Sequence, residues 1–105
     1  MPLIADTPPA PYYAVIFTSV RTEVEDGYDS MAEKMLELAA RQPGFLGAES
    51  AREDVGITVS YWSNLESIQN WKAVAEHREA QKLGREQWYA SYRIRISKVE
   101  RDYGS

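Results

Sequence analysis

One run near the start of the chain, Tyr12 to Thr22 (YYAVIFTSVRT), sets the strongest limit on the fold. It is rich in aromatic and β-branched residues, which favour a strand. Its apolar side chains fall on both alternating sets of positions, so both faces of the strand are apolar. Because such a strand is stable when each face is covered, the sequence predicts a first strand buried from two sides.

The next segment has the spacing of an amphipathic helix. Gly27 to Arg41 (GYDSMAEKMLELAAR) ends before Gln42-Pro43-Gly44, a sequence that stops a helix. Its apolar residues share one helical face, namely Tyr28, Met31, Met35 and Leu38. We therefore predict a helix that packs this face against the sheet.

A hairpin is predicted after this helix. Phe45 to Glu53 (FLGAESARE) and Ile57 to Ser63 (ITVSYWS) flank the turn-like tripeptide Asp54-Val55-Gly56. Alternation in the second arm places Trp62 on the opposite face from Tyr61.

A second helix is predicted to follow the hairpin. Ser63-Asn64-Leu65-Glu66 has the form of a capping box, and Leu65, Ile68 and Trp71 follow at helical spacing. The helix continues into EHREAQKLGREQWYASY, residues 76 to 92. One inward stripe then holds His77, Ala80 or Gln81, Gly84, Trp88 and Tyr92.

The last strand is predicted over Tyr92 to Tyr103 (YRIRISKVERDY). Its apolar residues change parity between Ile96 and Val99, which a β-bulge near Ser97 would explain. The order β-α-β-β-α-β is that of a ferredoxin-like, split βαβ α+β fold with two helices on one sheet face. Because the other face is also apolar, we expect a homodimer packed sheet to sheet.

Composition limits the classes of function. The chain of 105 residues fits one domain, residues 12–105, preceded by an arm, residues 1–11, that holds four of the five prolines. There is no cysteine and a single histidine, so we expect no metal site within the chain. The net charge of −4 with interleaved basic residues argues against nucleic acid as a partner. The chain has no apolar run long enough for a membrane span and no signal-peptide pattern, so the cytoplasm is expected.

A long stretch of the chain resembles the antibiotic biosynthesis monooxygenase family of dimeric α+β barrel proteins. The likeness rests on YWSNLESIQNWKAVAEHREAQKLGREQWY, on PGFLGAE and on the preceding strand, and it spans roughly residues 12–103. Its most telling part is the pattern W-S-x-x-x-x-I-x-x-W-K from Trp62 to Lys72, with His77 six residues after Trp71.

The resemblance implies a small-molecule site between the helices and the sheet, and a dimer that closes a barrel on the other face. The family includes cofactor-independent monooxygenases that oxidise polycyclic phenols, haem-degrading oxygenases, and proteins of other or unknown activity. The haem-degrading members are similar in using an Asn on the first strand, a Trp on the second helix and a His ten residues later. Here Trp71 matches, but Gln81 stands at the His position and Thr18 or Ser19 at the Asn position. Glutamine is a poor haem ligand, so we expect no haem and no other cofactor.

These considerations give a set of candidate residues for a site that binds an aromatic or polyketide-like molecule. His77 is the candidate base, because an imidazole titrates near neutral pH. Trp62, Trp71 and Trp88 would supply flat apolar walls, and Tyr61 or Tyr89 would donate a hydrogen bond to a phenolate. Thr18 and Gln81 complete the ligand-facing set by the resemblance.

Simpler interpretations of the same residues stay open. A lone helix histidine beside Glu76, Arg78 and Glu79 often serves only as a solvated side chain, and tryptophans on helices are usually core residues. The first alternative to a monooxygenase is a dimeric barrel protein that binds small molecules, or is associated with stress, without turnover. A haem-degrading oxygenase is the second and less favoured alternative.

Overall fold

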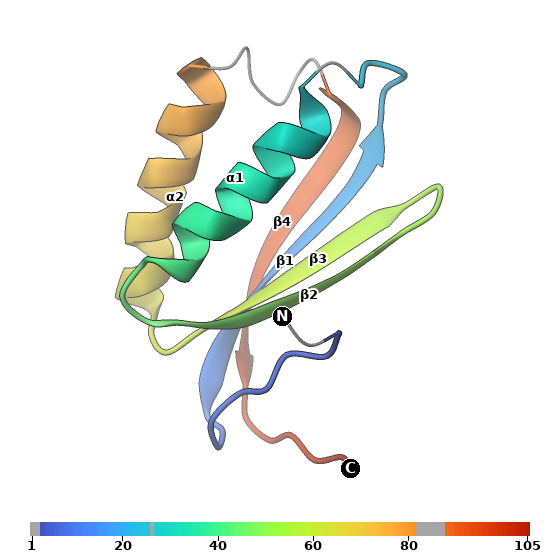
Figure 1. Cartoon of the computed structure of the whole chain (residues 1–105). Coiled ribbons are helices and arrows are strands. Elements are labelled where there is room, and N and C mark those ends of the chain that lie inside the picture. The colour runs from blue at the N-terminus through green and yellow to red at the C-terminus, as the bar shows by residue number, and fades with distance from the viewer. Residues whose placement is uncertain (1–2, 26, 82–87) are drawn as a thin grey trace.

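The computed structural model describes residues 3–25, 27–81 and 88–105, with residues 77–81 described by their backbone alone. Within these ranges the elements are β1 (Tyr12–Arg21), α1 (Tyr28–Ala40), β2 (Phe45–Arg52), β3 (Gly56–Trp62), α2 (Leu65–Gln81) and β4 (Tyr89–Val99). The strands form one antiparallel sheet in the order β2-β3-β1-β4. Both helices lie on the same side of this sheet (Figure 1). The ferredoxin-like α+β fold predicted from the sequence is therefore confirmed.

The helices pack on the side of the sheet that we term the inner face. Strand register places Tyr13 of β1 beside Trp62 of β3 on this face. Trp62 packs with Ile68 of α2 and Ala39 of α1, and its side chain is 0% exposed. Because a buried indole removes a large apolar area from water, this residue joins both helices to the sheet.

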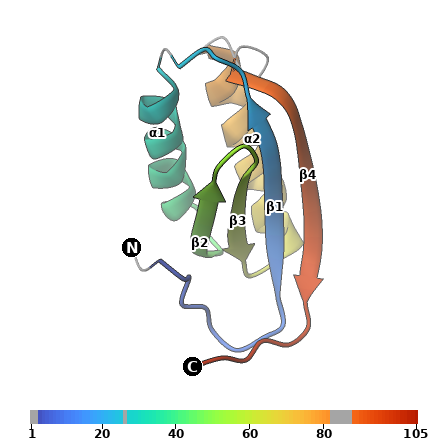
Figure 2. The same ribbon diagram turned by 90° about the vertical axis from the view of Figure 1, so that its right-hand side faces the viewer.

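No helix lies on the opposite side of the sheet, which we term the outer face (Figure 2). Alternation along β1 and its register with β3 bring Ile16, Val20, Ile57 and Val59 to this face. Val20 is 39% exposed and Ile57 is 44% exposed. The first strand thus has two apolar faces, as predicted, but the helices of this chain cover only one of them.

One end of the outer face is contacted by the N-terminal arm. The backbone N–H of Ala5 donates to Oε1 of Glu49 at 2.9 Å, and the Thr7 hydroxyl donates to the Tyr12 hydroxyl at 3.0 Å. Gly47 permits the close approach of the arm, because a Cβ there would lie 3.1 Å from the Cβ of Ala5. Tyr12 is consequently only 4% exposed.

The N-terminus of α2 differs in detail from the capping box predicted from Ser63. The helix begins at Leu65, so Asn64 is the residue in the capping position. The side-chain oxygen of Asn64 accepts a hydrogen bond from the backbone N–H of Ser67 at 2.8 Å. The cap is therefore Asn64, and the prediction was one residue early.

The last strand also differs from its predicted form. It begins at Tyr89 rather than Tyr92, so Tyr92 belongs to β4 and does not extend the helical stripe of α2. Pairing with β1 is continuous from Val99 to Ser91, and the register shifts between Val20 and Arg21 instead of near Ser97. The change of parity has a simpler cause, because the isoleucines of β4 lie on the inner face and Val99 lies on the outer face.

Candidate functional site

A stack of aromatic rings lies between α2 and the inner face. The rings of Trp62 and Trp71 are stacked at an interplanar angle of 24°, with centroids 6.1 Å apart, and Phe45 meets Trp62 edge-on at 5.4 Å. The Trp62 indole N–H donates to the Ser60 hydroxyl at 2.9 Å. Trp62 is fully buried, whereas Trp71 and Phe45 are half-buried, so Trp71 retains ring surface on the α2 side of the stack for a ligand.

A second aromatic group lies at the end of the inner face where α1 begins. The Tyr28 ring of α1 meets Trp88 and Tyr89 edge-on, each with centroids 5.9 Å apart. Phe17 of β1 contacts Tyr89 at 5.2 Å and Tyr92 at 5.9 Å. The Tyr89 hydroxyl donates to the Tyr28 hydroxyl at 3.4 Å. We term these five residues the Tyr28 group.

Arg21 lies against the Tyr28 group. Its guanidinium carbon is 3.3 Å from the centroid of the Tyr28 ring, and Nη2 donates to the Val24 carbonyl at 2.9 Å. A guanidinium over a tyrosine ring is a favourable cation–π contact. Arg21 thereby holds the connection to α1, whose first turn follows Gly27 and has no side-chain cap.

A second arginine, Arg52 at the end of β2, crosses the inner face of the hairpin. Its Nη2 donates to the Ser19 hydroxyl, and the Ser19 side chain is only 2% exposed. Gly56 lies beneath the guanidinium, and a Cβ there would be 2.1 Å from both Cζ and Nη2 of Arg52. The absence of a side chain at Gly56 therefore permits the path of Arg52 across the sheet.

The predicted site residues divide between the two faces of the sheet. Trp62 and Trp71 meet in the inner stack, while Trp88 lies in the Tyr28 group. Tyr61 is adjacent in sequence to Trp62 and lies on the outer face, and Thr18 likewise pairs with Ile57 on that face. The structure does not bring Tyr61 and Thr18 together with the tryptophans.

His77 and Gln81 lie in the final turns of α2, and their side chains fall outside the described part of the structure. Gly84, which was predicted to continue their stripe, lies in the stretch 82–87 that is also not described. The roles expected of His77 and Gln81 therefore stay predictions.

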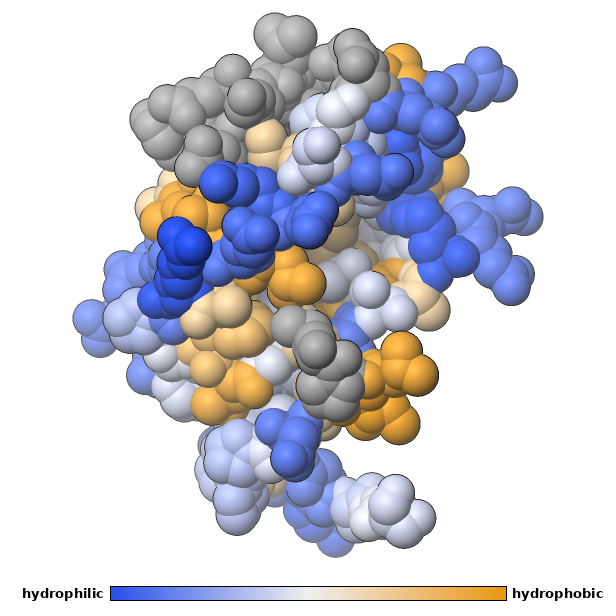
Figure 3. Space-filling view, in the orientation of Figure 1, coloured by the Kyte–Doolittle hydropathy of each residue, from blue (hydrophilic) through white to orange (hydrophobic). Residues whose placement is uncertain are grey.

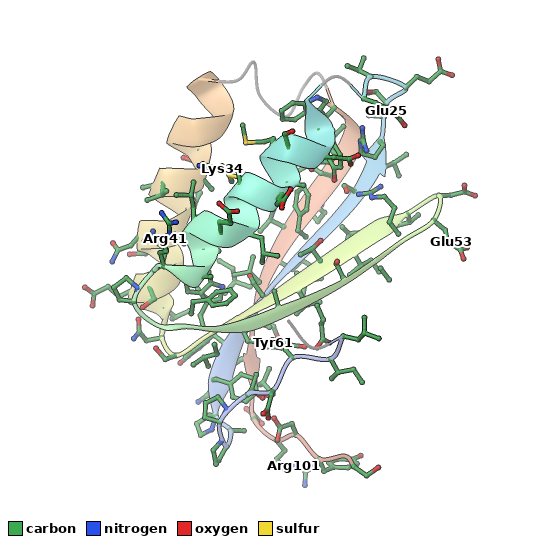
Figure 4. The ribbon with its side chains drawn as sticks, viewed as in Figure 1. Glu25, Lys34, Arg41, Glu53, Tyr61 and Arg101 are labelled. Carbon is green, nitrogen blue, oxygen red and sulfur yellow. The ribbon has the colours of Figure 1, made fainter. Side chains whose placement is uncertain are left out.

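Tyr61 is held in a polar cluster on the outer face, beside the arm (Figure 4). Its hydroxyl donates to Oε2 of Glu49 at 3.1 Å, and its ring meets Tyr12 edge-on at 5.7 Å. Burial, followed by the hydrogen bond to Glu49, raises the pKa of Tyr61 to about 12. The hydrogen bond to Asp102 is the main cause that raises the pKa of Tyr12. Both hydroxyls therefore stay protonated at neutral pH and are unsuited to act as bases.

The described residues offer neither a metal-ligand cluster nor a membrane-spanning helix. Among the side chains of residues 3–25, 27–76 and 88–105, no three histidine, aspartate or glutamate groups lie so that they could hold a metal ion. No helix in these ranges combines the length and the apolar character needed to cross a bilayer.

Arg52 on the inner face was not predicted from the sequence as part of a site, and Ser19 was named only as the alternative to Thr18 at the first-strand position. Arg52 has the same parity in β2 as Ala48, which is buried on the inner face. That alternation was a usable signal for the face on which Arg52 lies. The contact with Ser19 depends on pairing between β3 and β1, which a single strand pattern does not reveal.

Comparison with known proteins agrees with this architecture. The model of the antibiotic biosynthesis monooxygenase family matches residues 11–83. A Bacillus subtilis protein of uncharacterized function, YqjZ, is 52% identical over 103 residues, which cover 96% of this chain and 90% of YqjZ.

Solved structures with the same fold are more distant in sequence. SnoaB from Streptomyces nogalater, described as a cofactor-independent oxygenase, has a TM-score of 0.71 at 13% identity, with 91% of this chain and 100% of SnoaB covered. Protein SO0527 from Shewanella oneidensis has a TM-score of 0.72 at 9% identity, with 92% and 100% covered. The family match over most of the chain, together with this shared fold, shows that the chain belongs to the antibiotic biosynthesis monooxygenase family.

Proposed function

We propose that this protein is a cofactor-independent monooxygenase whose substrate is an aromatic or polyketide-like molecule held between the helices and the inner face. The observation that carries the proposal is the half-buried Trp71, whose ring is fixed by stacking on the buried Trp62. A rigid indole with free surface is suited to packing against a flat ligand. Membership of the family and the fold shared with SnoaB support the same class of reaction.

The chemistry needs little from the protein when the substrate is itself the electron donor. Removal of a proton from a phenol or an anthrone gives an anion that can reduce O2. One oxygen atom enters the substrate as a carbonyl, and the other leaves as water with two hydrogens of the substrate. In an anthrone both hydrogens come from the oxidised carbon, and in a phenol one comes from the oxidised ring carbon and one from the hydroxyl. The protein then has to supply a base, apolar walls and a site that excludes water.

We propose His77 as the base in this reaction. It follows Trp71 by six residues in α2, and imidazole is the side chain whose ordinary pKa lies closest to neutral pH. The test is oxygen consumption with an anthrone or a dihydroxynaphthalene, in the wild type and in His77→Ala. Loss of turnover by about 100-fold, with folding and ligand binding retained, is the expected result.

Other outcomes of this assay would change the assignment. Unchanged turnover in His77→Ala would remove the histidine from the mechanism. Binding of aromatic ligands without consumption of oxygen would favour a binding protein over an enzyme. A Soret shift on addition of equimolar haem, abolished in His77→Ala, would favour a haem-degrading oxygenase over a cofactor-independent one.

We further propose that two copies pack through their outer faces to form a homodimer. The support is the uncovered apolar set of Ile16, Val20, Ile57 and Val59 on that face. Because water-exposed apolar area of this kind is stabilised by burial, a second sheet is its natural cover.

A further inference from the structure

Arg52 differs from an ordinary surface arginine because its position is fixed by the residues beneath it. The guanidinium crosses Gly56, where a Cβ would collide with it, and donates to the nearly fully buried hydroxyl of Ser19. A long flexible side chain that is ordered before binding loses less entropy when it meets a ligand. The guanidinium of Arg52 is therefore held in position before a ligand binds.

The charge of Arg52 is not neutralised within the described part of the chain. No ion pair to Arg52 is found among the described side chains, and Arg52 stays solvent-exposed. The nearest acidic residue in the sequence, Glu53, points outward from the tip of the hairpin and away from α1 (Figure 4). Donors of the guanidinium that Ser19 does not use are consequently left for another acceptor.

Arg52 lies on the same face as the Tyr28 group. Ser19, which accepts its hydrogen bond, is flanked along β1 by Phe17 and Arg21, and alternate residues of a strand are about 7 Å apart on one face. Phe17 contacts Tyr89, and Arg21 covers the ring of Tyr28. Aromatic surface and two guanidinium groups thus occupy neighbouring positions at this end of the inner face.

This end of the inner face is open to solvent. Ser50 and Thr58 pair with each other on the inner face of the hairpin, yet both are exposed. The hairpin extends beyond α1 (Figure 1), and hydrophilic side chains cover its projecting end (Figure 3). A ligand packed against the aromatic rings could therefore place a polar group beside Arg52 without burying it.

From this arrangement we infer that Arg52, supported by Ser19 and Gly56, binds an anionic group of the ligand, so that the preferred ligands are aromatic acids. Guanidinium presents paired N–H donors that match a carboxylate, which makes a carboxylated aromatic molecule the best fit. The inference rests on the proposed function in one respect, because it takes the inner face as the ligand-binding side of the sheet. It places the aromatic ring against the Tyr28 group, which lies at the opposite end of that face from Trp62 and Trp71.

The test is a binding titration with a matched pair of probes, a hydroxynaphthoate and its methyl ester, which share the ring and differ in charge. Wild type is expected to bind the acid about 10-fold more tightly than the ester. Arg52→Gln should abolish this preference and leave the affinity for the ester unchanged. Arg52→Lys should keep part of it, because the charge remains while the paired donors are lost.

Arg101→Gln is the matched control, because Arg101 lies on the C-terminal tail, far from the hairpin tip (Figure 4). It removes one positive charge and should preserve the preference for the acid. Thermal unfolding of each variant separates the two possible roles of Arg52, since a purely structural arginine would lower the melting temperature without changing the selectivity.

Equal binding of acid and ester by the wild type would overturn the inference while leaving the proposed function intact. The inference also fails if Arg52→Gln, or Arg52→Lys where the glutamine variant does not fold, binds both probes as the wild type does. Failure of both probes to bind would overturn the inference, whereas the proposed function, whose ligand packs on Trp71, is tested separately by the oxygen-consumption assay.

Discussion

At the scale of single residues, Tyr61 and Trp62 show how neighbours in one strand acquire different environments. Trp62 is fully buried between the helices and the sheet, and it donates to Ser60. Tyr61 points to the outer face, where its hydroxyl donates to Glu49. The alternation of a β-strand is sufficient to separate the two, and it was readable in the sequence.

Tyr61 should make the unfolding free energy of the protein depend on pH in the alkaline range. Its pKa is about 12 in the folded chain and about 10 in an unfolded one, so folding favours the protonated hydroxyl. The resulting stability is fully present below pH 10 and is lost as the pH rises towards 12. Urea unfolding of the wild type and of Tyr61→Phe, measured between these two pH limits, should show that the unfolding free energy falls more steeply with pH in the wild type. Parallel curves would contradict the assignment.

Truncation of Trp62 should be among the most damaging single changes. Trp62→Ala leaves a large cavity between α2 and the sheet, and such changes cost about 3–5 kcal/mol of unfolding free energy. Trp71→Ala removes the half-buried partner ring and should cost clearly less. Urea denaturation of both variants measures the difference, and equal losses would show that Trp62 is not the centre of this core.

At the scale of elements, Gly44 fixes the turn from α1 to β2. Its φ of +87° is a left-handed conformation that favours glycine, and an added Cβ would lie 2.2 Å from the Ser67 hydroxyl. Gly44→Ala should therefore lower the unfolding free energy by about 2 kcal/mol or more. Gly104→Ala is the control, since nothing lies within 4 Å of that position. A neutral Gly44→Ala would mean that this turn can readjust without strain.

Elements with strong periodicity were predicted closely, whereas features that depend on pairing were not. The first helix was expected over Gly27 to Arg41 and spans Tyr28–Ala40, because its apolar spacing and its stop signal agree. The bulge was misplaced at Ser97, because an exposed edge strand can carry apolar residues on both faces without an irregularity. The contact of Arg52 with Ser19 could not be predicted, since it requires the register across β2, β3 and β1.

At the scale of the whole molecule, the outer face should control association. Ile57→Lys places a charge in the centre of the proposed contact between two sheets, where burial without a partner is costly. The dimer should dissociate at least about 10-fold more readily than the wild type, as measured by sedimentation or light scattering. Leu36→Lys is the control, because Leu36 is similarly exposed on α1. A wild-type protein that is monomeric at micromolar concentration would rule out the proposed dimer.

The N-terminal arm contacts the C-terminal segment of the chain. Through Thr7, which donates to the Tyr12 hydroxyl at 3.0 Å and to Asp102 at 3.4 Å, residues near the two termini are already in contact. A short linker could therefore join Asp102 to Thr7 and allow circular permutation of the chain. The new ends would be placed in the hairpin turn at Asp54. A fusion partner joined ahead of the arm or after Asp102 would emerge beside the outer face, and so would compete for space with the second copy proposed there.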